Sequence, residues 1–81
     1  SQVNERRDMS MYTFVFYYEN GMTNLFEHIE RVSFTDGPEL TGQQILDYRY
    51  RLNTEYHLYS KDSSFTVGYR NLVYVEVHKE D

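Results

Sequence analysis

The chain has 81 residues and a formal net charge of −5. This length predicts one domain, and the charge disfavours direct binding of nucleic acid, whose phosphates it would repel. No cysteine is present, which excludes disulfides and thiolate chemistry and is typical of a reducing compartment, so we expect a cytoplasmic protein. No apolar run approaches the roughly 18 residues of a membrane span. Nine tyrosines and five phenylalanines, with no alanine, favour strands over helices.

Residues 1–8 are polar and have no apolar period, so we expect a flexible arm before a single β-rich domain over residues 9–81. The run from Met11 to Glu19 alternates, with one face formed by Tyr12, Phe14, Phe16 and Tyr18 and the other by Met11, Thr13, Val15 and Tyr17. Both faces are largely apolar, which predicts a strand covered on both sides.

Asn20-Gly21 is a strong hairpin signal, because a type I′ turn needs positive φ at both central positions. A two-residue turn would pair Glu19 with Met22 and Val15 with Phe26 in the returning strand. In that register Phe26 lies on the same face as Val15.

Beyond Phe26 the apolar spacing becomes irregular, which predicts a bulge near His28-Ile29 and then a strand ending at Phe34. The segment Thr35-Asp36-Gly37-Pro38 predicts a turn.

The segment from Thr41 to Ser60 is ambiguous. Thr41 and Gln44 have the spacing of a capping box, which favours a helix. However, apolar residues alternate with polar ones over thirteen positions, at Leu46, Tyr48, Tyr50, Leu52, Thr54, Tyr56 and Leu58. We therefore predict a long strand from about Ile45 to Tyr59, with at most one short helix near residues 39–46.

The end of the chain predicts two further strands. Lys61-Asp62-Ser63 is a turn signal, Phe65 and Val67 alternate with polar residues, and Arg70-Asn71 marks a second turn. In the last strand Val73, Val75 and Val77 would point inward and Tyr74, Glu76 and His78 outward. The prediction is an all-β, mainly antiparallel fold: a small meander barrel or a two-layer sandwich of six to seven strands.

No motif for catalysis stands out. There is no Gly-x-Ser-x-Gly elbow, the glycines are isolated, and no spacing indicates a carboxylate pair for glycoside hydrolysis. Three pairs place a histidine and a glutamate on one strand face: His28/Glu30, Glu55/His57 and Glu76/His78. Such pairs can hold a metal only if two of them meet. We therefore expect no enzyme activity, no cofactor and no metal.

Two binding functions stay open. The run Tyr48-Arg49-Tyr50-Arg51 interleaves aromatic and basic residues, as in small barrels that stack single-stranded nucleic acid on their rings. Alternation places the tyrosines and arginines on opposite faces, however, and the net charge opposes this alternative.

We favour a protein-interaction module, because nine tyrosines exceed what so small a core can enclose and tyrosine is enriched at interfaces. A small acidic chain can occupy the basic surface of a nucleic-acid-handling enzyme, in the style of the inhibitors of CRISPR and restriction enzymes that phages and mobile elements encode. The apolar first strand also suggests a homodimer. The candidate interaction residues are Tyr17, Phe26, Arg49, Arg51, Glu55, Tyr74 and Glu76.

Overall fold

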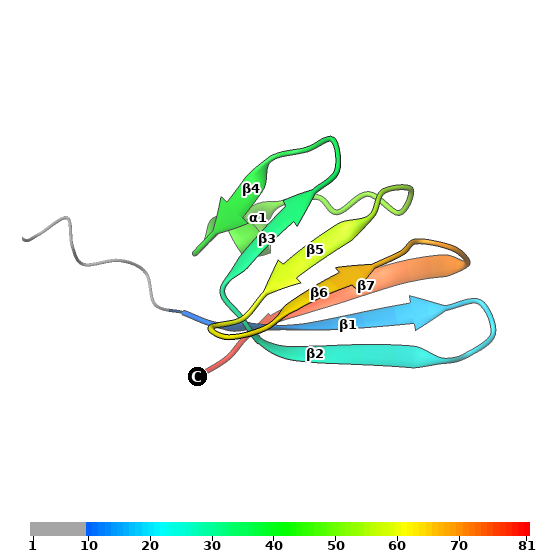
Figure 1. The fold of residues 1–81 in the computed structure, drawn as a ribbon. Helices are drawn as coiled ribbons and strands as arrows, with labels where there is room; N and C mark the ends of the chain where they lie inside the picture. The colour runs from blue at the N-terminus through cyan, green and yellow to red at the C-terminus, as the bar shows by residue number, and fades with distance from the viewer. Residues whose placement is uncertain (1–9) are drawn as a thin grey trace, which may run out of the picture.

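The computed structural model describes residues 10–81, so the arm expected over residues 1–8 lies outside the described residues. Within this range seven strands form two antiparallel sheets, and there is one short helix (Figure 1). In chain order the elements are β1 (Tyr12–Tyr18), β2 (Thr23–Ile29), β3 (Arg31–Phe34), β4 (Glu39–Thr41), α1 (Gln44–Asp47), β5 (Tyr56–Tyr59), β6 (Ser64–Val67) and β7 (Leu72–Lys79). The predicted all-β class is confirmed, and of the two architectures the chain adopts the two-layer sandwich.

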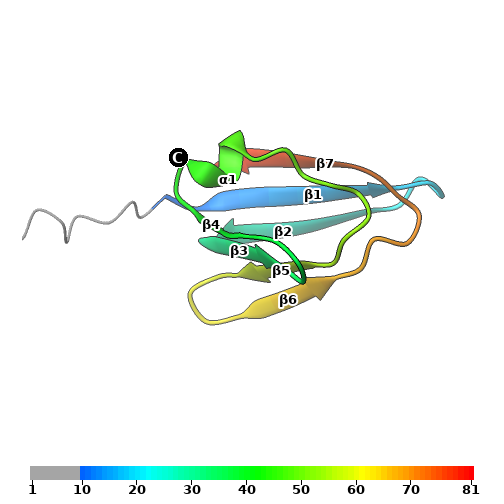
Figure 2. The same ribbon diagram turned by 90° about the horizontal axis from the view of Figure 1, so that it is seen from above.

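The first sheet has the strand order β2-β1-β7, so β1 is its central strand (Figure 2). Alternation along β1 divides its side chains as predicted: Tyr12, Phe14 and Phe16 are completely buried, and the residues between them are half-buried. The inner face of this strand therefore forms one wall of the core.

The turn between β1 and β2 lies at Asn20-Gly21, as predicted, but it is one residue longer than a type I′ turn. The Tyr18 amide donates to the Met22 carbonyl at 3.0 Å, which leaves a three-residue loop of Glu19, Asn20 and Gly21. Only Gly21 has positive φ there, at 85°, as in the common three-residue hairpin loop. The predicted register is therefore wrong: Phe26 pairs with Phe14 and lies on the inner face.

The predicted bulge is confirmed and connects the two sheets. The register between β1 and β2 shifts after the Phe14–Phe26 pair, and His28 has a φ of 63°. The extra residue bends the chain, so that β3 leaves the first sheet and joins the second, whose order is β4-β3-β5-β6.

The long strand predicted from Ile45 to Tyr59 is wrong over most of its length. Residues 44–47 form α1, residues 48–55 are irregular, and only Tyr56–Tyr59 form a strand, β5. Half of the capping box is present, because the Gln44 side chain accepts from the Thr41 amide at 3.1 Å. Helix formation buries Ile45 and leaves Leu46 37% exposed, the reverse of the expectation for a strand.

The last strands follow the prediction more closely. Val67 in β6 is buried, the Arg70-Asn71 turn is closed by a bond from the Leu72 amide to the Tyr69 carbonyl, and β7 pairs along β1. Val75 and Val77 pack against the core as expected. Val73 does not, since a register shift at the start of β7 leaves it 45% exposed and buries Leu72 instead.

Aromatic contacts join the two sheets. Phe16 of β1 meets Tyr56 of β5 edge to face at 5.2 Å between ring centroids. Between the edge strands β2 and β6, the rings of Phe26 and Phe65 are 5.1 Å apart between centroids. Each such pair contributes about 0.5–1.5 kcal/mol beyond the burial of its area. These contacts attach the inner face of the first sheet to the second sheet. Within residues 10–81 no further layer covers the opposite, outer face of the first sheet.

The only helix within residues 10–81 has four residues, and no helix there is long and apolar enough to cross a membrane. The cytoplasmic location stays a prediction.

Candidate functional site

The outer face of the first sheet brings together three of the predicted interaction residues. We define this outer face by the β1 residues that alternate with the core and by their direct partners on β2 and β7. Its members are Thr13, Val15, Tyr17, Thr23, Leu25, Tyr74, Glu76 and His78. Neither lysine nor arginine is among these eight residues. Leu25 is 57% and Tyr74 47% exposed, so apolar and aromatic surface is available for contact.

Two tyrosines form a stacked pair on this face, toward the end of β1 that leads into the hairpin loop. Tyr17 of β1 and Tyr74 of β7 are direct cross-strand partners, with ring centroids 4.3 Å apart and ring planes 20° apart. Each ring restricts the rotation of the other, so the pair presents a rigid aromatic surface with little side-chain entropy left to lose on binding.

A carboxylate lies beside the stacked pair. The Tyr17 hydroxyl donates to Glu76 Oε1 at 2.8 Å, and the His78 ring nitrogen Nε2 lies 3.4 Å from the same oxygen. The hydrogen bond from Tyr17, followed by the one with His78, lowers the pKa of Glu76 below its usual 4.5. The same hydrogen bond raises the pKa of Tyr17 to about 12. At neutral pH the face therefore presents a carboxylate anion held by a protonated tyrosine.

The structure gathers three of the seven predicted interaction residues, Tyr17, Tyr74 and Glu76, on the outer face. Phe26 points into the sandwich, where its ring meets Phe16 edge to face at 5.7 Å.

The remaining three predicted residues lie in the irregular segment between α1 and β5. Arg49 and Arg51 are exposed in the irregular segment 48–55. The Glu55 side chain lies 3.4 Å from both Thr35 Oγ1 and His57 Nε2. These residues are therefore not part of the outer face.

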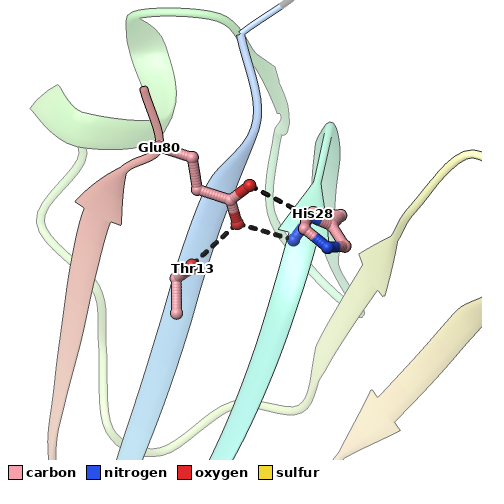
Figure 3. A network of polar contacts seen from close by, with 3 residues as sticks. All are labelled: Thr13, His28 and Glu80. Carbon is pink, nitrogen blue, oxygen red and sulfur yellow. Dashed lines mark hydrogen bonds and ion pairs between the residues drawn. The ribbon is translucent and has the colours of Figure 1, made fainter.

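The sequence did not indicate the role of Glu80, which joins the end of the chain to the bulge in β2 (Figure 3). Its carboxylate accepts from the His28 amide and from Thr13 Oγ1, both at 2.7 Å, and lies 2.8 Å from His28 Nδ1. Partial burial raises the pKa of Glu80, but the bonds from His28 and Thr13 outweigh it and lower the pKa overall. This network of Glu80, His28 and Thr13 fixes the strained bulge at one end of the outer face.

The histidine–glutamate pairs do not meet. In the pairs Glu55/His57 and Glu76/His78 the histidine Nε2 lies 3.4 Å from the glutamate Oε1. His28 forms its ion pair with Glu80 and not with Glu30. Across residues 10–81 no group of three histidine, aspartate or glutamate side chains is arranged to hold a metal ion.

A hollow of about 640 Å³ lies beside the bulge, between β2 and the turn from β5 to β6. Its lining includes Glu27, Glu30, Lys61 and Asp62 around the ring of Phe65. It contains none of the predicted interaction residues, and its opposed charges do not select one kind of ligand.

Comparisons of the chain with protein-family models, with curated proteins and with solved structures found no match. The geometry and charge of the outer face are therefore the basis for a functional assignment.

Proposed function

We propose that this chain is a non-enzymatic protein-interaction module that docks through its outer face on a basic surface of a partner protein. The observation that supports this most directly is the stacked pair of Tyr17 and Tyr74 beside the ionised Glu76, on a sheet face without lysine or arginine. Rigid tyrosines are common anchors of protein interfaces, and a negative face steers association with a positive one.

The kind of partner follows from charge. A net charge of −5 on 81 residues favours a partner whose surface is strongly positive. Enzymes that handle nucleic acid carry such surfaces in their substrate grooves. We therefore propose an inhibitor of the anti-CRISPR or antirestriction style, whose carboxylates take the place of substrate phosphates.

A homodimer through the outer face is disfavoured by the same charges. Two copies facing each other across a two-fold axis would bring the Glu76 carboxylate toward the same carboxylate of the second copy, with no lysine or arginine on the face to offset the repulsion. Phe26, one of the interaction residues predicted from the sequence, is packed against Phe16 and Phe65 and is not available to a second copy on this face. A heterologous partner agrees better with this surface.

Direct binding of single-stranded nucleic acid is the competing function. It would need tyrosine rings that are free to stack on bases beside basic residues. Tyr48 and Tyr50 are instead half-buried and pack on Phe34, at 5.2 and 5.9 Å between ring centroids. The exposed ring of Tyr74 and the half-buried ring of Tyr17 lie near a carboxylate, which repels phosphate.

The test is affinity capture with the immobilised chain, using candidate nucleic-acid enzymes and lysate of the native host. Wild type is compared with the double variant Tyr74→Ala/Glu76→Gln, and with the control Tyr69→Ala/Glu55→Gln, which makes the same changes away from the outer face. We expect a basic partner that wild type and control retain and the outer-face variant loses. Equal capture by all three, or salt-sensitive gel shifts with single-stranded oligonucleotides, would contradict the proposal.

A further inference from the structure

One arginine of the chain, Arg31, is held by a tyrosine ring and a carboxylate on the second sheet. Its contacts show which side chains can bind a guanidinium on a sheet surface. The guanidinium carbon of Arg31 lies 3.9 Å from the centroid of the Tyr59 ring, its direct partner across β3 and β5. Arg31 Nη1 also lies 2.6 Å from Glu39 Oε2 on β4. A tyrosine ring and a carboxylate together therefore satisfy one guanidinium on the exposed side of the second sheet.

The outer face of the first sheet also has a tyrosine and a carboxylate near each other, here on one strand and without an arginine. Tyr74 and Glu76 are two residues apart on β7, so their side chains leave the same face about 6–7 Å apart along the strand. Both contacts described above for Glu76, with Tyr17 and with His78, go to the same oxygen, Oε1. Lysine and arginine are absent from the eight residues of this face.

The stacked pair also leaves one aromatic surface open. Tyr17 covers one side of the Tyr74 ring. β7 is an edge strand of its sheet, so within residues 10–81 no strand lies beyond it on the other side, although the short helix α1 contacts part of β7. Tyr74 is 47% exposed. A guanidinium can therefore approach the open side of the Tyr74 ring from the edge of the sheet, and Glu76 lies two residues away on the same strand.

We infer that Tyr74 and Glu76 form an arginine-binding site, which takes an arginine side chain from the basic surface of the partner protein. This inference rests on the proposed function and adds which basic residue is recognised. Arginine fits because its planar guanidinium stacks on an aromatic ring while its N–H groups reach a carboxylate, whereas the lysine ammonium is a strongly hydrated point charge. Glu76 supplies the charge, and Tyr17 keeps that carboxylate in place through its hydroxyl.

The experiment is a titration of the ¹⁵N-labelled full chain with a tetra-arginine peptide and, separately, with a tetra-lysine peptide of equal length and charge. We expect saturable shifts of the Tyr17, Tyr74 and Glu76 amides, and an affinity for the arginine peptide about three- to tenfold higher than for the lysine peptide. Tyr74→Leu and Glu76→Gln should each abolish this preference. Tyr74→Phe, which keeps the ring, should retain it.

Two controls and two adverse outcomes complete the test. Tyr69→Leu changes a tyrosine of almost the same exposure, 49%, and Glu55→Gln removes the same charge at the second sheet, so both should retain the preference. Equal affinity for the two peptides, with shifts on the outer face, would overturn the arginine inference and leave the proposed function standing. Shifts confined to other surfaces with both peptides would overturn both.

Discussion

Truncation of Phe26 and of its neighbour Leu25 tests the register of the β1–β2 hairpin, which determines the composition of the outer face. In the structure Phe26 lies on the inner face, where its ring contacts Phe16 and Phe65, and Leu25 pairs with Val15 on the outer face and is 57% exposed. With a two-residue turn the positions would be exchanged, because a slip of one residue moves every side chain of a strand to the other face.

The expected magnitudes differ clearly. A fully buried Phe→Ala change costs about 3–5 kcal/mol, so the half-buried Phe26 should lose about 2–3 kcal/mol, including its two aromatic contacts. Leu25→Ala should cost less than about 1 kcal/mol, because little of its surface leaves water on folding. For a chain with a total stability of about 4–12 kcal/mol, the Phe26 variant should melt about 10–20 °C lower.

Thermal and urea melts followed by circular dichroism measure both variants, and light scattering measures their mass. The mass should be the same for wild type and Phe26→Ala, because Phe26 is part of the core. An equal or larger loss for Leu25→Ala would refute the three-residue loop and the outer face built on it. A lower mass for Phe26→Ala, with an unchanged melting temperature, would make Phe26 a dimer anchor.

Three further predictions use the same measurements. Gly21→Val should cost about 1–3 kcal/mol, because a β-branched residue resists the φ of 85°; an unchanged melt would contradict this turn geometry. Ile45→Ala should cost about 2–4 kcal/mol and Leu46→Ala less than about 1 kcal/mol, because helix α1 buries the first; the reverse order would favour the strand over the helix. The pKa of His28 is raised from 6.5 by its hydrogen bond to Glu80 and by the charge of that carboxylate. Protonated His28 therefore stabilises the folded state fully below pH 6.5, and this contribution is lost as the pH rises through the raised pKa. The pKa of Glu80 is lowered from 4.5, so its stabilisation is complete above pH 4.5 and is lost as the pH falls. The melting temperature difference between wild type and Glu80→Gln should therefore be largest between about pH 4.5 and 6.5, and a constant difference from pH 4 to 8 would contradict the ion pair.

The hairpin shows what a local signal can and cannot predict. Asn20-Gly21 located the turn and the positive φ of Gly21, because only a residue without Cβ adopts that conformation readily. The loop length was not available from the dipeptide. Asn20 uses its side chain rather than a positive φ, since its Oδ1 accepts from the Met22 amide at 3.0 Å and stabilises the longer loop.

The segment 44–55 shows why alternation misled. A period of two reports an extended backbone and does not require a partner strand, and Tyr48 indeed has extended dihedral angles of −75° and 143°. In this segment tyrosine side chains, in place of a partner strand, bond backbone carbonyl groups. The Tyr50 hydroxyl donates to the Ile45 carbonyl at 2.7 Å, and the Tyr56 hydroxyl donates to the Arg51 carbonyl. These bonds depend on tertiary packing around Phe34, which local spacing cannot reveal.

For the candidate site, the excess of tyrosine correctly pointed to exposed rings, and alternation in β7 placed Tyr74 and Glu76 together. The partnership with Tyr17 depends on pairing between the first and last strands, and such long-range contacts leave no local pattern. The same is true of Glu80, whose partners His28 and Thr13 are far away in the sequence.

The pairing of β1 with β7 also governs how the chain reaches this state. Tyr12 pairs with Lys79 and Tyr18 with Leu72, so the central strand of the first sheet has only one neighbour until residues 72–79 have been synthesised. A two-stranded hairpin alone is marginally stable in water, and contacts between distant segments slow folding. Before Leu72–Lys79 are present, one edge of β1 therefore has no strand partner, and a chain cut before Leu72 keeps that edge free. Such a fragment is prone to aggregate, because the free edge of β1 can pair with other chains.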